Sequence, residues 1–271
     1  MKEYIKKFDS ASDANDYAIA DIPFTTSVAT NPIQNLVCNQ SGKKLVNINE
    51  SLVIRSTPPK MIDLGLSVKW AATNIGAVPG STKESYYGDY YAWGETETKS
   101  DYSWSTYKYA NGAYDKLTKY CHINKTDYWG GEGSPDNKLI LEVADDVANV
   151  TYGSNYHMPT QAESEELIAL PKKWVTNFKD ISGLNGIIFA KTQTELDGTF
   201  DDDTMLFIPA AGLFDGSTRN YTGSHCFLWS SSLGSVDPDS ARELHFKSIL
   251  FSLGSGSRCY GISVRCVSTA S

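Results

Sequence analysis

Beyond about residue 60, the chain is a series of short apolar segments joined by long polar connections. Residues 186–190, 204–209 and 226–230 are apolar and bounded by Gly, Pro or Asp, which predicts strands. Residues 63–71 alternate with period two, so we expect a strand with one buried face. Because the strands are many and short, the pattern predicts an α+β fold with small antiparallel sheets, one or two helices and long loops.

One clear helix is predicted after Thr160. Thr160 and Glu163 have the spacing of a capping box, in which a hydroxyl and a carboxylate each accept a hydrogen bond from an open backbone N–H group. Leu167 and Leu170 belong to its buried stripe, and Pro171 ends it.

Aromatic residues are concentrated just before the middle of the chain. Residues 86–93 read Tyr-Tyr-Gly-Asp-Tyr-Tyr-Ala-Trp, and we interpret them as an aromatic-rich strand that packs in the core rather than as a platform for sugars. Residues 94–137 are rich in Gly, Ser, Asp and Tyr without a clear period, which predicts a long ordered loop region.

Residues 234–260 place small, chemically unrelated side chains on a sparse apolar frame. Within this stretch, alternation puts Leu244 and Phe246 on one face and Glu243 and His245 on the other. A buried frame with arbitrary exposed residues is typical of a display surface, so we predict binding and no catalytic residues. The predicted ligand-binding residues are Ser235, Val236, Asp237, Asp239, Ser240, His245, Ser248, Leu250, Ser252, Gly254, Ser255, Gly256, Ser257, Cys259 and Tyr260.

Composition and charge exclude two classes of partner. The formal net charge is -8, and no basic patch interrupts it, so phosphates of a nucleic acid would be repelled. No stretch of about 18 apolar residues predicts a membrane span. The first nine residues lack the apolar core of a secretion signal, so we expect synthesis in the cytoplasm without a signal peptide.

The sequence predicts neither a metal site nor a cofactor. Asp201, Asp202 and Asp203 lack the glycine and the terminal Glu of a calcium loop, so we interpret them as a solvated acidic turn. Residues 230–232 are serines without a nucleophile elbow, and we expect their hydroxyls to bond backbone groups. The cysteines are odd in number and lack a CxxC motif, which predicts reduced, mostly buried thiols at Cys38, Cys121, Cys226, Cys259 and Cys266.

Residues 1–60 differ from the rest and are predicted to be a separate appendage or attachment segment, with residues 61–271 as the ligand-binding domain. We expect a short helix over residues 9–20, short strands at 36–38 and 45–48, and a stiff linker at 56–59. The segment is small for independent folding. We therefore expect it to dock on another subunit or, as an equal alternative, to pack on the main domain as a strand pair.

Five landmarks in order give residues 61–271 a family resemblance. They resemble the major paralogous domain of gut anaerobes, which is similar in layout to the C-type lectin-like fold and to its formylglycine-generating enzyme branch. The landmarks are DLGLSVKWA at 63–71, GDYYAWGE at 88–95, HMPT at 157–160 with its helix, IPAAG at 208–212, and LWSSS at 228–232 closing with GISVRCV at 261–267.

The carboxy-terminal stretch resembles the variable region of proteins diversified by retroelements, such as phage tropism determinants. Those systems mutate adenines, so that an Asn codon never yields Lys, Glu, Gln, Met or Trp. Between residues 234 and 260, only Glu243 and Lys247 fall outside that restriction. In that family the variable residues line a shallow surface and contact a receptor, and the resemblance implies the same role here.

The resemblance implies a virion-associated receptor-binding protein at the tail tip of a phage or prophage. Such a protein would contact a protein or glycan receptor on a cell surface. Residues 1–60 would attach it to other virion subunits. The alternative is a bacterial cell-surface adhesin that binds glycans or proteins. Calcium-dependent lectins of this fold carry Glu-Pro-Asn and Trp-Asn-Asp motifs. Here Trp229 is followed by Ser230 and no Glu-Pro-Asn motif occurs, so calcium-mediated sugar binding is not expected. An oxidase role is not expected either, because Cys266 is predicted to face inward and Cys259 lies in the variable-looking stretch.

Overall fold

The computed structural model describes residues 4–6, 19–21 and 58–269. Contacts divide the chain into two compact units, Met1–Thr57 and Pro58–Ser271. In the first unit, β1 (Tyr4–Lys6) pairs with β2 (Ile19–Asp21) as an antiparallel ladder. The predicted helix over residues 9–20 is therefore wrong for its last two residues, which belong to β2. The rest of that helix, the predicted strands at 36–38 and 45–48, and residues 56 and 57 of the predicted linker lie outside the described residues.

The second unit is mixed α+β, with small sheets and few helices, as the sequence predicted, although it has four α-helices where one or two were expected. Its α-helices are α1 (Glu84–Tyr87), α2 (Val147–Tyr152), α3 (Gln161–Ala169) and α4 (Gln193–Asp197). Single turns of 3-10 helix lie at Thr126–Tyr128, Val143–Asp145 and Phe178–Asp180. None of the helices in the described part of the chain is long and apolar enough to cross a membrane.

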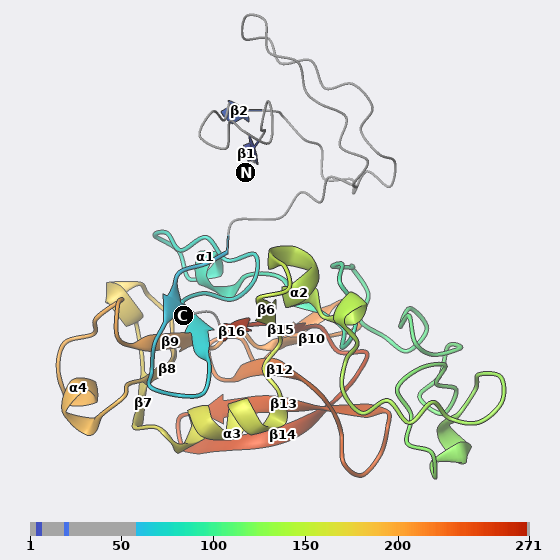
Figure 1. Ribbon diagram of the computed structural model, residues 1–271. Coiled ribbons are helices and arrows are strands. Elements are labelled where there is room, and N and C mark those ends of the chain that lie inside the picture. Colours follow the sequence, from blue (N-terminus) through green and yellow to red (C-terminus); the bar gives the residue numbers. More distant parts are fainter. Residues whose placement is uncertain (1–3, 7–18, 22–57, 270–271) are drawn as a thin grey trace, which may run out of the picture. The chain divides into compact units, whose positions relative to one another are not determined.

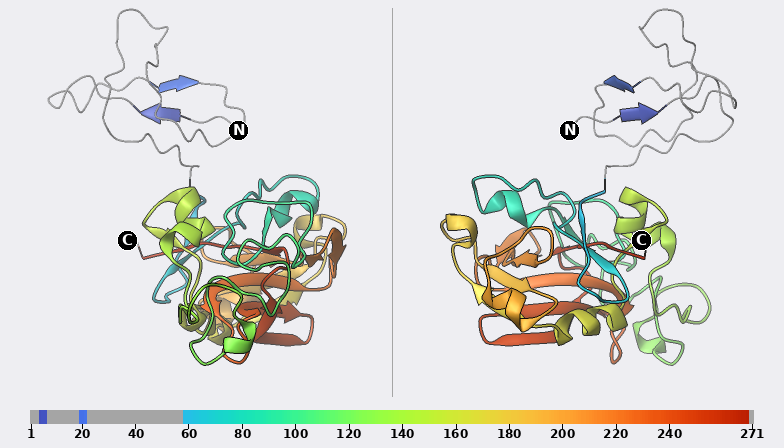
Figure 2. Two further views of the ribbon diagram at one scale, coloured as in Figure 1. Left: turned by 90° about the vertical axis from the view of Figure 1, so that its right-hand side faces the viewer. Right: turned by 60° about the vertical axis from the view of Figure 1, so that its left-hand side comes forward.

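A five-stranded sheet dominates this unit, in the order β14-β13-β12-β15-β5. Its strands are β5 (Tyr90–Tyr91), β12 (Cys226–Leu233), β13 (Ser240–Lys247), β14 (Leu250–Ser257) and β15 (Ile262–Ser263). β12 and β15 are parallel, an exception to the predicted antiparallel pairing. β12, β13 and β14, drawn in orange to red, run side by side with α3 against them (Figure 1; Figure 2).

Three smaller sheets complete the unit. The first holds β3 (Met61–Ile62), β4 (Lys69–Ala71), β16 (Val267–Ser268) and β6 (Tyr156–His157). The second holds β7 (Lys172–Val175), β8 (Gly186–Phe189) and β9 (Leu206–Pro209). The third is the hairpin of β10 (Leu213–Asp215) and β11 (Thr218–Asn220). The sequence predicted β8, β9, β12 and β13, and it missed β7, β10 and β11.

The five-stranded sheet separates two apolar cores. Along β12, Leu228 belongs to the core that includes Leu167 of α3, whereas Phe227 and Trp229 belong to an aromatic core on the other side. On β13, Leu244 continues the first core. On the opposite face of β13, the aromatic core ends after Ala241, and polar side chains take its place. On this face the apolar core therefore covers only part of the sheet, and beyond it lie the buried Glu243 and the partly exposed His245 and Lys247.

Two predicted strands are wrong, and glycines explain both. Residues 63–71 form the turn after β3 and then β4, and only residues 69–71 are a strand, because Gly65 adopts a φ of 72° and its N–H donates to Asp63 Oδ1 at 2.8 Å. Within 86–93, the first residues belong to α1 and only Tyr90–Tyr91 form a strand. Gly88 ends α1 at a φ of 71°, in a place where a β-carbon would lie 2.4 Å from the Ile75 carbonyl oxygen.

The predicted helix is confirmed as α3, including its capping box. Thr160 Oγ1 accepts a hydrogen bond from the Glu163 backbone N–H, and Glu163 Oε2 accepts one from the Thr160 N–H at 2.7 Å. His157 Nε2 lies 3.0 Å from Glu163 Oε1, so the cap is also paired with the end of β6.

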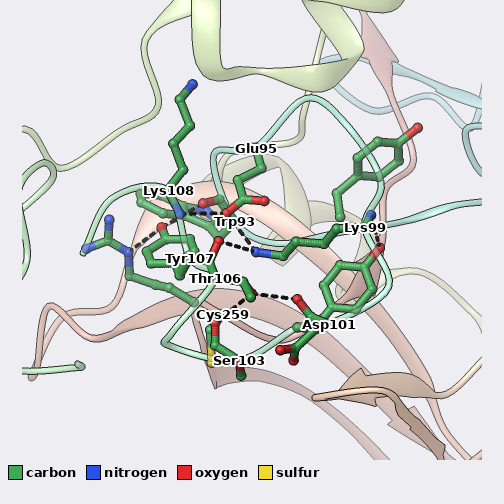
Figure 3. Close-up of polar contacts among 12 residues, drawn as sticks. Trp93, Glu95, Lys99, Asp101, Ser103, Thr106, Tyr107, Lys108 and Cys259 are labelled. Atoms are coloured by element: carbon green, nitrogen blue, oxygen red, sulfur yellow. Dashed lines mark hydrogen bonds and ion pairs between the residues drawn. The ribbon is translucent and has the colours of Figure 1, made fainter. Parts of the chain in front are cut away.

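Residues 94–137 form the predicted long loop, with one turn of 3-10 helix and no strand. Hydrogen bonds hold its first part in place (Figure 3). Glu95 Oε1 accepts from Lys99 Nζ at 2.9 Å and from the Lys108 N–H at 2.8 Å. The Tyr107 hydroxyl donates to the Trp93 carbonyl oxygen at 2.7 Å and itself accepts from Arg258 Nε at 2.9 Å. Backbone hydrogen bonds, such as those from the Leu117 N–H to Tyr128 and from the Gly130 N–H to Leu117, both at 2.8 Å, hold the later part, so side chains and backbone together order this loop.

Candidate binding surface

Register places part of the predicted contact set on one face of the sheet. Glu243 pairs with Gly254, His245 pairs with Ser252, and their side chains share the face of Phe227 and Trp229. We call this the Glu243 face, defined by Phe227, Trp229, Glu243, His245, Lys247, Leu250, Ser252, Gly254 and Gly256. It gathers the predicted contact residues His245, Leu250, Ser252, Gly254 and Gly256.

The other predicted contact residues lie elsewhere. Ser255 is on the opposite face, where its Oγ accepts from Arg242 at 3.3 Å. Ser240 and Ser257 pair with each other and lie on that opposite face as well. The connection between β12 and β13 carries Ser235, Val236, Asp237 and Asp239, and Asp237 pairs with Lys125 at 3.0 Å. Ser248 is exposed in the turn between β13 and β14. With Cys259 and Tyr260, which lie between β14 and β15, the contact set is therefore divided between two faces and three connections.

Cys259 is wrong as a contact residue, because only 3% of its surface is exposed. After β14 the chain turns inward, and Cys259 packs in the aromatic core with its Sγ 3.4 Å from Ser257 Oγ. Burial raises its pKa, and burial raises the pKa of Cys266 to about 12, so both thiols stay protonated near neutral pH. The neighbouring Tyr260 is half-buried against the same core.

A stack of rings continues the Glu243 face towards solvent. The Phe227 and His245 rings stack with centroids 4.5 Å apart, and His225 lies 5.3 Å from His245. Tyr221 packs on His225 at 4.8 Å and is 55% exposed. Sequence reasoning missed Tyr221 and His225; the available signal was that His225 stands two residues before Phe227 and so shares its face.

Glu243 is a third residue that the contact prediction omitted. Its side chain shares a face with His245, as predicted, yet Glu243 is only 6% exposed. Its Oε2 has no hydrogen-bond partner among the described residues, and neither has His245 Nε2. Burial raises the pKa of Glu243 to about 8, and burial lowers the pKa of His245, helped by His225 and Lys247. Both groups are therefore largely uncharged near neutral pH.

Two glycines of β14 make room for this carboxyl group. A β-carbon at Gly256 would lie 2.5 Å from Glu243 Oε2 and 3.1 Å from Trp229 Cη2. A β-carbon at Gly254 would come no closer than 3.2 Å to Glu243 Oε1. The prediction that this position can vary is therefore wrong for Gly256, because a larger side chain there would collide with Glu243 and Trp229.

We expect Gly256→Ala to lower the free energy of unfolding by about 1–2 kcal/mol, because the overpacked carboxyl and indole have little space to move. Gly254→Ala is the matched control on the same strand and face, and it is expected to change stability by less than about 0.5 kcal/mol. Urea unfolding of both variants checks this. Equal effects of the two substitutions would contradict the packing described here.

Acidic and hydroxyl groups elsewhere have structural partners. Lys60 pairs with Asp203, and Lys179 pairs with Asp202 at 2.7 Å, at the acidic turn. Ser231 Oγ donates to the Pro159 carbonyl oxygen at 3.4 Å, so its hydroxyl serves the backbone as predicted. Within residues 58–269 and the two short strands before them, no cluster of His, Cys, Asp and Glu side chains has the composition of a metal site.

The Glu243 face thus combines aromatic rings, small side chains and two buried polar atoms without partners. On β14 the neighbours of these groups are Ser252, Gly254 and Gly256, whose side chains are small or absent. Comparisons of the chain with protein-family models, with curated proteins and with solved structures found no match.

Proposed function

We propose that this chain is a non-enzymatic recognition protein with a C-type lectin-like fold that binds a receptor through the Glu243 face and the adjoining Tyr221, His225 and Tyr260. The observation that carries the proposal is the pair of buried, unpartnered atoms, Glu243 Oε2 and His245 Nε2. Leaving such an atom without a partner costs about 1–3 kcal/mol. A ligand that supplies the partners recovers this free energy on binding.

The chemistry around the surface supports binding rather than catalysis. Ser224 Oγ lies 2.9 Å from His225 Nδ1, but no described carboxylate is hydrogen-bonded to His225, so the third group of a hydrolytic triad is missing. The buried thiols of Cys259 and Cys266 are protonated and therefore weak nucleophiles.

The proposed biological role is that of a phage or prophage receptor-binding protein, with residues 1–60 as the attachment to other virion subunits. Support for it is the resemblance of residues 234–260 to a retroelement-diversified region, together with the small residues Ser252, Gly254 and Gly256 on one face. A nearby reverse transcriptase gene and a near-copy of the codons for residues 229–267, with adenines at the varied positions, are expected in the encoding genome. A genome without either counts against this role.

Binding to intact bacterial cells tests the surface directly. We expect Tyr221→Ala and His245→Ala to reduce the amount of labelled protein retained on susceptible cells by about tenfold, because each removes an aromatic contact of roughly 1.5 kcal/mol. Tyr114→Ala is the control, since Tyr114 is 52% exposed, much like Tyr221, and lies in the 94–137 loop. An equal loss for all variants, or for none, contradicts the proposed surface.

The same assay separates the alternative, a bacterial adhesin that binds glycans with calcium. Retention abolished by a calcium chelator and restored by calcium would favour that adhesin. Retention unaffected by the chelator is expected, because the described residues lack a cluster that would hold the ion.

A further inference from the structure

The Glu243 carboxyl group is surrounded by groups that neither donate to it nor neutralise it. Burial alone raises its pKa, with no contribution from any charged side chain. Trp229 and Ala241 flank the space over Gly256, and Glu243 Oε2 is without a hydrogen-bond donor among the described residues. A carboxyl group in this state favours a ligand that brings donors of its own.

Access to the carboxyl lies along β14. Gly254 is only half-buried and has no side chain, so nothing of its own covers Glu243 Oε1 from that strand. Tyr260 comes three residues after β14 and is half-buried against the aromatic core. Burial raises its pKa, and the charge of Asp215 is the next cause.

We propose that the Glu243 carboxyl receives a cationic N–H donor, the guanidinium or ammonium group of an arginine or lysine side chain of the bound receptor, whose aliphatic part lies over Gly254 and beside Tyr260. This assignment rests on the proposed function, because it names the chemistry that the same surface binds.

A cation gains more at this place than a neutral donor does. Hydrogen bonds between ionised groups are about twice as strong as neutral ones, and tyrosine rings attract cations through their faces. The net charge of -8 draws cations to the protein. Lys247 opposes this, but it stands four positions from Glu243 along β13, which is about 13 Å.

The test uses the full chain near the pKa of Glu243, about pH 8, where roughly half of the carboxyl groups are ionised. The probes are N-acetyl-arginine amide, N-acetyl-lysine amide and N-acetyl-citrulline amide, since citrulline keeps the shape of arginine without its charge. Binding is followed by NMR as shifts of the Gly254 and Gly256 amide signals. We expect millimolar binding of the two cations and about tenfold weaker binding of the citrulline amide.

Variants identify the carboxyl group. Glu243→Gln keeps the side-chain size and is expected to remove the preference for arginine amide over citrulline amide. Glu165→Gln is the control, because Glu165 is exposed on α3, which packs against the opposite face of the sheet; its preference is expected to stay tenfold.

Equal binding of arginine and citrulline amides to the native chain overturns the proposal, and so does binding of neither cation. An unchanged preference in a folded Glu243→Gln variant also overturns it. The citrulline comparison needs no variant and so does not depend on how Glu243→Gln folds. The cell-retention experiment with Tyr221→Ala is independent of these probes, so a failure here leaves the proposed binding surface to be judged separately.

Discussion

Replacing Glu243 by glutamine is expected to raise the free energy of unfolding by about 5 kcal/mol at about pH 9 and to change it little at about pH 4. Burial raises the pKa of this carboxyl from 4.5 in the unfolded chain to about 8 in the folded protein. Between these values the folded state binds the proton that the unfolded state has lost. The contribution of this group to the stability of the native chain is therefore fully present below about pH 4.5, declines as the pH rises towards 8, and is lost above it.

Urea unfolding at a series of pH values measures the difference between the native chain and Glu243→Gln. Other acids with raised pKa values, such as the buried Asp146, contribute equally to both proteins, so the difference isolates Glu243. The exposed Glu165→Gln substitution is expected to give a difference that does not vary with pH. A flat difference for Glu243→Gln as well would mean that its carboxyl is hydrated, and the buried site described above would be wrong.

Arg258→Ala is expected to lower the free energy of unfolding by roughly 4 kcal/mol, because it leaves several buried acceptors without donors. The guanidinium is fully buried and donates to the Tyr107 hydroxyl and to the carbonyl oxygens of Lys119, Tyr120 and Pro238, at 2.8–2.9 Å. It also lies over the rings of Trp93, Tyr107 and Tyr120. One side chain thus connects the end of β14 to the 94–137 loop.

Two further substitutions distinguish this role from that of a charge alone. Arg258→Lys keeps the charge but lacks the planar set of donors, so its cost is expected to approach that of alanine. Arg242→Ala is the matched control, since Arg242 is less buried and its donors reach only the exposed hydroxyls of Ser235 and Ser255; a change of less than about 1 kcal/mol is expected. Similar costs at positions 242 and 258 would contradict the anchoring role.

Glu243 and Arg258 belong to neighbouring parts of the structure. Arg258 follows β14 directly, and its N–H donates to the Asp239 carbonyl oxygen at 3.0 Å, next to the start of β13. The 94–137 loop and the β13–β14 hairpin are therefore joined at this end. Loss of Arg258 is expected to weaken receptor binding as well, because the hairpin carries the Glu243 face.

Local signals explain which parts of the fold could be predicted. The α3 helix was found because Thr160 and Glu163 complete its cap within three residues of sequence. The strands β8, β9, β12 and β13 were found because their apolar residues follow short, regular patterns. The prediction failed at Gly65 and Gly88, where positive φ angles turn the chain although the surrounding residues resemble a strand.

In the candidate site, too, the sequence predicted some features and not others. Alternation along β13 correctly separated Glu243 and His245 from Leu244. It could not show that Glu243 is buried, because the cover comes from Trp229 on β12 and the close approach of β14. Cys259 looked like one more member of a variable series, and the inward turn at Arg258 put it in the core.

By itself, the sequence determined where α3 and several strands, among them β8, β9, β12 and β13, lie and which side chains of β13 share a face, since hydrogen bonding and spacing within a few residues decide both. Only the tertiary structure decided which face stays open, and that Glu243, Arg258 and Cys259 are interior. The physical reason is that burial is set by segments close in space and far apart along the chain, such as Tyr107 and Tyr120 around Arg258.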